Sequence, residues 1–269
     1  MKTGFPFNCG PADHPRGTAH SSRTEIKKNE TFDTLFGGKL KFIQDRRGYR
    51  FSLDAVLLAA FVNVRGVELV ADLGTGNGVV PIILAHNNPR VTITGFELQP
   101  ALVERARRSV DENGFAERIR ILHCDIRRIR SLSRPESFDS VVCNPPYRRA
   151  SSGRVSPNPE KQLARHEFAG DLKDFLSAGS FLLRLKGSFA IVYLAERTAE
   201  LLASLRDLRL EPKRVRMVHS RLGSNASLVL VEAVKGARAG VEIAPALIVY
   251  DDEKNYTPEV AAIIGGSAA

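Results

Sequence analysis

Residues 72–78 read Asp72-Leu73-Gly74-Thr75-Gly76-Asn77-Gly78. An apolar run at residues 67–71 predicts a β-strand before this segment, and residues 79–86 predict a helix after it. Glycine adopts the sharp backbone turns that such a loop requires and lets the backbone approach a ligand closely. The amino terminus of the following helix favours an anionic group. The segment therefore predicts a ligand-binding loop between a strand and a helix; the alternative is a structural turn that binds nothing.

The alternation of strand and helix continues along the chain. Further strands are predicted at residues 91–96, 119–124, 138–143 and 188–194, and helices at residues 100–113, 171–185 and 196–208. Residues 215–219 and 227–233 are typical of a closing pair of strands. Strands that alternate with helices form mostly parallel sheets with helices on both faces. We therefore expect an α/β fold with a mostly parallel seven-stranded sheet and an antiparallel closing strand.

Polar residues stand where the predicted strands end. Asp72 begins the glycine loop, Glu97 ends the second strand, Asp125 follows the third and Asn144 the fourth. The carboxyl ends of parallel strands meet at one edge of the sheet, where such folds bind ligands. Glu97 can accept hydrogen bonds from both ribose hydroxyls of a nucleoside, and Asp125 can accept one from the amino group of the nucleoside's adenine. The alternatives are an exposed glutamate at a strand end and an aspartate that caps a helix or lies in a solvated loop.

The spacing of the loop glycines bears on the identity of that ligand. Gly74, Gly76 and Gly78 follow the pattern Gly-x-Gly-x-Gly, and Val79 stands where a dinucleotide-binding loop carries its third glycine. This departure favours S-adenosylmethionine (SAM) over a nicotinamide dinucleotide.

Residues 144–147 read Asn144-Pro145-Pro146-Tyr147 and carry the sharpest chemical signal. The prolines fix the backbone and remove N–H donors, while Asn144 offers a side-chain carbonyl oxygen and Pro145 a main-chain one. Two converging acceptors can hold both protons of an exocyclic amine and direct its lone pair, otherwise delocalised into the ring, at a sulfonium methyl group. Tyr147 can stack on a planar substrate. The pattern predicts methyl transfer to a planar nitrogen; the alternative is a proline turn capped by an aromatic residue.

The residues before the alternating region predict a small β-rich segment. Residues 39–43 predict a strand, residues 46–48 a turn, and Tyr49-Arg50-Phe51 the returning strand. Ser52 is the expected N-cap of the helix that follows. We expect a flexible extension at residues 1–30, a main domain at residues 31–264 with residues 31–66 as its hairpin-and-helix preface, and a tail at residues 265–269.

Composition favours a polyanionic partner. The 269 residues include 39 Lys and Arg against 30 Asp and Glu, a net charge of +9, which is typical of proteins that bind nucleic acid. A generally basic solvated surface is the alternative. Cys9, Cys124 and Cys143 form no Cys-x-x-Cys pair, so we expect no metal site. No segment is apolar over the length needed to span a bilayer, and we expect a cytoplasmic protein with reduced thiols.

At these motifs the chain resembles the class I SAM-dependent methyltransferases, whose fold is Rossmann-like. The resemblance is carried by residues 72–78, Glu97, Asp125 and residues 144–147. The Asn-Pro-Pro-Tyr form is shared by N6-adenine methyltransferases and by glutamine N5-methyltransferases of release factors. Further segments resemble the bacterial tRNA(Val) N6-adenine methyltransferases: residues 51–59, 164–167, 247–250 and 255–257.

The resemblance implies a set of site residues. It implies SAM bound at Asp72, Gly74, Gly76, Gly78, Glu97 and Asp125, with Asp54 near the methionine end of the cofactor. It implies a target adenine at Asn144, Pro145 and Tyr147, with Pro146, Arg148, Arg149 and Arg165 on the RNA side. The alternatives are a capping role for Asp54 and solvated loop charges for the three arginines.

The expected function is therefore N6-adenine methylation of RNA, in tRNA beside the anticodon. The alternatives are a glutamine N5-methyltransferase acting on protein and a catalytically silent module that binds SAM or RNA. The oligomeric state is left open by the sequence.

Overall fold

The computed structural model describes residues 26–47, 50–64, 66, 68–147 and 171–266. A central sheet has seven main strands in the order β8-β9-β7-β6-β3-β4-β5. Their bounds are β3 Leu69–Leu73, β4 Thr92–Glu97, β5 Ile119–His123, β6 Phe138–Cys143, β7 Leu183–Leu194, β8 Leu210–His219 and β9 Ala226–Lys235. Among these seven, β9 alone runs antiparallel to its neighbours, which confirms the predicted mostly parallel sheet. Two short strands, β10 Glu242–Ile243 and β11 Leu247–Ile248, pair in parallel with β8 and were not predicted.

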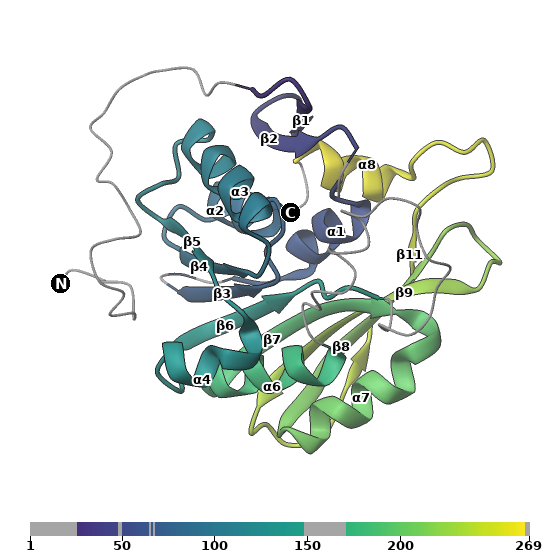
Figure 1. Ribbon diagram of the computed structural model, residues 1–269. Helices are drawn as coiled ribbons and strands as arrows, with labels where there is room; N and C mark the ends of the chain where they lie inside the picture. The colour runs from purple at the N-terminus through teal and green to yellow at the C-terminus, as the bar shows by residue number, and fades with distance from the viewer. Residues whose placement is uncertain (1–25, 48–49, 65, 67, 148–170, 267–269) are drawn as a thin grey trace, which may run out of the picture.

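Helices cover both faces of this sheet (Figure 1). One apolar cluster joins its first face to α1 Leu53–Phe61, α2 Val79–Asn87, α3 Pro100–Glu112 and α8 Pro258–Gly265. A second cluster joins the other face to η1 Ile126–Arg128, α4 Ile129–Leu132, α6 Leu172–Leu182 and α7 Thr198–Asp207, which follows η2 Ala195–Arg197. The described part of the chain contains no helix that is long and apolar enough to cross a membrane.

The amino-terminal hairpin differs from its prediction. Strand β1 Glu30–Leu35 pairs antiparallel with β2 Leu40–Asp45, and the chain reverses between them through Phe36, Gly37 and Gly38, all with positive φ. The predicted returning strand at Tyr49-Arg50-Phe51 is wrong for Arg50 and Phe51, which lie outside any strand, whereas Tyr49 is outside the described residues. The glycine pair lets the chain turn before β2, so β2 pairs with β1 and not with the predicted strand at residues 49–51.

Two other strands start earlier than predicted, because pairing with a neighbouring strand extends beyond the apolar residues. Strand β7 starts at Leu183 rather than residue 188, and β8 starts at Leu210 rather than residue 215. An apolar run such as residues 181–183 fits either a helix or a strand, and pairing between Leu183 and Phe138 of β6 decides the outcome. Ser52 stands at the predicted N-cap position of α1, but its side chain makes no capping hydrogen bond. The division into extension, domain and tail stays a prediction.

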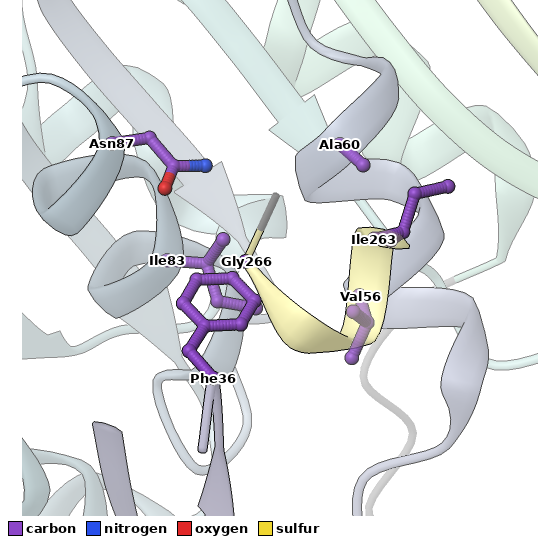
Figure 2. Close-up of a pocket in the computed structure, with 7 residues that line it drawn as sticks. All are labelled: Phe36, Val56, Ala60, Ile83, Asn87, Ile263 and Gly266. Atoms are coloured by element: carbon purple, nitrogen blue, oxygen red, sulfur yellow. The ribbon is translucent and has the colours of Figure 1, made fainter. Parts of the chain in front are cut away.

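Helix α8 closes the first face by packing between α1 and the hairpin. Figure 2 shows Gly266 beside Phe36, and Ile263 beside Val56 and Ala60. These residues line a cavity of about 20 Å³. Gly266 has φ +78°, and a Cβ there would lie 2.7 Å from Cγ of Phe36. Only glycine therefore lets the chain end α8 against the hairpin.

Candidate functional site

The carboxyl ends of four neighbouring strands bring the predicted residues to one edge of the sheet. Leu73 at the end of β3 pairs with Phe96 of β4 and with Cys143 of β6, and Glu97 at the end of β4 pairs with His123 of β5. The glycine loop, Glu97, Asp125 and Asn144 consequently follow adjacent strand ends. Their sequence order and the parallel topology explain this placement.

The glycine loop is hydrogen-bonded to β4, and three of its positions have a backbone conformation that favours glycine. Gly74, Gly76 and Gly78 have φ of +72°, +58° and +80°. The N–H groups of Gly74 and Thr75 both donate to the carbonyl of Phe96, at 2.8 and 3.0 Å. A Cβ on Gly74 would meet a ring carbon of Phe175 at 3.1 Å. Positive φ and close packing together explain the glycines.

Glu97 is buried, so the alternative of an exposed strand-end glutamate is wrong. Only 5% of its surface is accessible. Its Oε2 accepts the N–H of Gly76 at 2.9 Å and its Oε1 accepts the N–H of Gln99 at 2.9 Å. Burial raises the pKa of Glu97, and these backbone hydrogen bonds oppose the rise. Each carboxylate oxygen keeps lone-pair capacity for a further donor, so the residue can hold two hydroxyl groups.

The carboxylate of Asp72 is buried and lacks a hydrogen-bond donor among the described residues. It is 1% accessible, and neither oxygen accepts a hydrogen bond of good geometry from another described residue. Burial raises the pKa of Asp72 to about 7; the nearby Thr75 hydroxyl lowers it and the charge of Glu97 raises it. Buried polar groups are nearly always hydrogen-bonded, so this carboxylate points to a donor that a ligand supplies.

Asp125 has a structural role in addition to any ligand role. Its side chain caps η1 by accepting the N–H of Arg127 at 3.0 Å, and the Arg127 guanidinium pairs with it at 2.6 Å. These hydrogen bonds lower the pKa of Asp125. The helix-capping alternative is thus confirmed, and the role of Asp125 in adenine binding stays a prediction that relies on its remaining lone pairs.

The segment after β6 forms a cluster with the start of α1. Tyr147 is half-buried, and its hydroxyl lies 2.8 Å from Oδ2 of Asp54 and 3.2 Å from Oδ1 of Asn144. The Tyr147 ring packs edge-on against Tyr193 of β7, with ring centroids 5.9 Å apart. The hydroxyl of Tyr193 is in turn held by Arg197. Pro145 is buried and Pro146 is exposed.

Sequence reasoning placed Asp54 near the cofactor but missed its contact with Tyr147. It also missed Tyr193, because an aromatic residue in a predicted strand carries no functional signal. The predicted RNA-contacting residues Arg148, Arg149 and Arg165 lie outside the described residues. No group of three or more metal-ligating side chains occurs among residues that the structure describes.

The larger described cavity is separate from this edge. It measures about 450 Å³ and lies between α1, α8 and β8. Its two arginines, Arg214 and Arg216, are paired with Glu232 and Glu259. Because these charges are already satisfied, the cavity offers no chemistry comparable to that of the carboxyl edge.

Comparisons with known proteins agree with this geometry. A family model described as the methyltransferase small domain matches residues 53–200, more than half of the chain. The chain belongs to this family. This methyltransferase is 28% identical to the tRNA1(Val) (adenine(37)-N6)-methyltransferase of Tolumonas auensis, over 82% of the chain and 90% of the relative. It is 29% identical to the protein of the same name from Porphyromonas gingivalis, over 78% of the chain and 85% of the relative.

A solved structure supports the same fold. A predicted O-methyltransferase from Agrobacterium tumefaciens superposes with a TM-score of 0.66 and 27% identity, covering 80% of this chain and 97% of that one. The methyltransferase class, its Rossmann-like fold and SAM as methyl donor, all predicted from the motifs, are confirmed.

Proposed function

We propose that this methyltransferase transfers the methyl group of SAM to N6 of an adenine in RNA, in tRNA beside the anticodon. The observation that carries the proposal is the cluster of Asn144, Pro145 and Tyr147 at the carboxyl end of β6, next to the glycine loop. Relatives that cover most of this chain are named for N6 methylation of adenine 37 in tRNA1(Val), which supports the same base and polymer here.

The residues of the glycine loop fit SAM, because the buried carboxylate of Asp72 lacks a hydrogen-bond donor that SAM could supply. The orphaned carboxylate of Asp72 needs a donor, and the ammonium group of the methionine moiety would supply it. Glu97 would accept the ribose hydroxyls with the lone pairs that Gly76 and Gln99 leave open. Asp125 would accept the cofactor's adenine amine. When bound, SAM supplies an electrophilic sulfonium methyl group.

The target amine would be held by the segment after β6. Asn144 Oδ1 and the Pro145 carbonyl would each accept one proton of N6, which turns the nitrogen lone pair out of the ring plane. Tyr147 would stack on the adenine, and its own ring is fixed by Tyr193. Catalysis on this account is mainly the positioning of two reactants in line.

A basic segment that begins beside the site, directly after Asp125, supports RNA as the polymer. Residues 126–134 contain four arginines and no acidic residue. Arg127 pairs with Asp125, whereas Arg128, Arg130 and Arg134 are exposed and form no ion pair with any other described residue. Phosphates are the partners that exposed arginines of this kind bind in RNA. Arg148, Arg149 and Arg165 would extend this contact from the segment after Tyr147.

The polymer is tested by offering purified enzyme labelled SAM with bulk tRNA and, separately, with release-factor protein. Label in tRNA supports the proposal. Label found only in glutamine of the protein would replace the proposed function with glutamine N5 methylation. The lone pair of the glutamine amide nitrogen is also delocalised, so the same residues could activate it. Binding of SAM with no transfer to either polymer would favour a silent binding module.

A further inference from the structure

The hydroxyl of Tyr147, in the segment after β6, lies close to two acceptors but can donate to only one of them. The Tyr147 hydroxyl has one proton, yet two acceptor oxygens lie within hydrogen-bond distance, Oδ2 of Asp54 at 2.8 Å and Oδ1 of Asn144 at 3.2 Å. A carboxylate forms the shorter and stronger hydrogen bond with a hydroxyl. Asp54 also stands in the first turn of α1, where the helix dipole favours a negative side chain. The proton therefore belongs to the Tyr147–Asp54 hydrogen bond.

The direction of the Tyr147 hydrogen bond bears on the orientation of the Asn144 amide. Because the Tyr147 hydroxyl donates its hydrogen bond to Asp54, its oxygen can only accept a hydrogen bond from Asn144. A half-turn about the Cβ–Cγ bond exchanges Oδ1 and Nδ2 without changing the shape of the side chain. The favourable orientation then has Nδ2 donating to the Tyr147 oxygen and Oδ1 turned towards the target amine.

We propose that Asp54 is a positioning residue that acts through the Tyr147 hydroxyl to keep Asn144 Oδ1 facing the target amine. Without an acceptor at position 54, Tyr147 donates to Asn144 Oδ1 instead. The amide then presents Nδ2, a donor, to an amine that is itself a donor. This inference rests on the proposed role of Asn144, and it assigns Asp54 to the substrate side of the reaction rather than to the cofactor.

The local structure makes such control effective. The Tyr147 ring is held edge-on by Tyr193, which is fully buried in β7. Asp54 is followed in α1 by five consecutive buried residues, Ala55 to Ala59, which anchor the helix against the sheet. The hydroxyl and the carboxylate are thus presented from two packed elements that lie 93 residues apart in sequence.

The test compares two substitutions of Asp54 in two backgrounds. Asp54→Ala removes the acceptor, and we expect turnover to fall at least tenfold while the Kd for S-adenosylhomocysteine changes less than about twofold. Asp54→Asn keeps a neutral carbonyl acceptor and should restore most of the turnover. In a Tyr147→Phe background, Asp54→Ala should cause little further loss, because the residue through which it acts is gone. Ser52→Ala, at an exposed N-cap position without a side-chain hydrogen bond, controls for disturbance of the helix start.

Two results would overturn the inference. One is an equal loss of turnover from Asp54→Ala in both backgrounds. The other is a loss of S-adenosylhomocysteine affinity that is shared by Asp54→Ala and Asp54→Asn, as expected if the carboxylate binds the cofactor's ammonium group.

A readout that needs no substrate separates this inference from the proposed function. In ¹⁵N-labelled protein, the side-chain amide resonances of Asn144, assigned by their absence in Asn144→Ala, should shift on Asp54→Ala and return towards their original position in Asp54→Asn. Unchanged resonances would refute the positioning role even if the wild-type enzyme methylates RNA. Shifted resonances would support it even if the methylated polymer proves to be protein.

Discussion

Replacement of Asp72 by Asn should stabilise the ligand-free enzyme above neutral pH. Both carboxylate oxygens are buried without a hydrogen-bond partner among the described residues, and burial raises the pKa of Asp72 from 3.8 to about 7. The native state therefore keeps this proton to higher pH than the unfolded chain does. Stability contributed by the neutral form is complete below pH 3.8 and is lost as the pH rises through about 7.

The size of the effect follows from the shift in pKa. A difference of about three units corresponds to about 4 kcal/mol of unfolding free energy at 1.36 kcal/mol per unit. The side-chain amide introduced by Asp72→Asn would carry no charge but would be buried and unsatisfied, which costs about 1–3 kcal/mol. We therefore expect Asp72→Asn to be about 1–3 kcal/mol more stable than wild type at pH 8. This advantage should shrink by about 1.4 kcal/mol per unit as the pH falls from 7 towards 5, because in this range the native carboxyl is protonated and the unfolded one is ionised.

Urea unfolding of the ligand-free proteins at pH 5, 6, 7 and 8 measures these free energies. Asp252→Asn, at an exposed acidic position, is the matched control and should follow the wild-type profile. With saturating SAM the order should reverse, because ligand binding stabilises wild type by mass action and the variant lacks the negative charge that would pair with the ammonium group. Parallel pH profiles for wild type and Asp72→Asn would refute the description of Asp72 as an unsatisfied buried acid.

Three further outcomes are expected. Asn144→Ala should abolish turnover while leaving SAM affinity nearly unchanged, measured by single-turnover kinetics and calorimetry, because Asn144 faces the target amine; near-normal turnover would contradict its role. Glu97→Ala should weaken SAM binding by about 1–3 kcal/mol in the same titration, the scale of lost charge-assisted hydrogen bonds, and an unchanged Kd would reject the ribose contact. Arg128→Gln should weaken tRNA binding and reduce its salt slope by about 1, whereas Arg90→Gln, exposed before β4 at the opposite edge of the sheet, should do neither.

The sheet and its polar edge were predictable because their signals are local. Apolar runs of strand length, the glycines after Asp72 and a polar residue at each strand end are all visible within a few positions. Parallel topology then brings those ends together without further information.

The remaining features depend on contacts between distant segments. The hydrogen bond from Tyr147 to Asp54 joins residues 93 positions apart, and the pattern of apolar residues along the sequence does not indicate such a contact. The start of β7 at Leu183 is decided by pairing with β6 in an apolar run that also suits a helix. The hairpin was misassigned because the turn at Gly37 and Gly38, rather than the later one, sets the pairing of β2.

The most direct test of the central claim is the chemical identity of the methylated nucleoside. Unmodified tRNA is incubated with the enzyme and SAM labelled in its methyl group, then digested completely to nucleosides and separated by chromatography. The account predicts that the label co-elutes with N6-methyladenosine, that it maps beside the anticodon, and that Asn144→Ala produces none. Label on a guanine or on a ring nitrogen of adenine, or N6-methyladenosine formed equally well by Asn144→Ala, would contradict it.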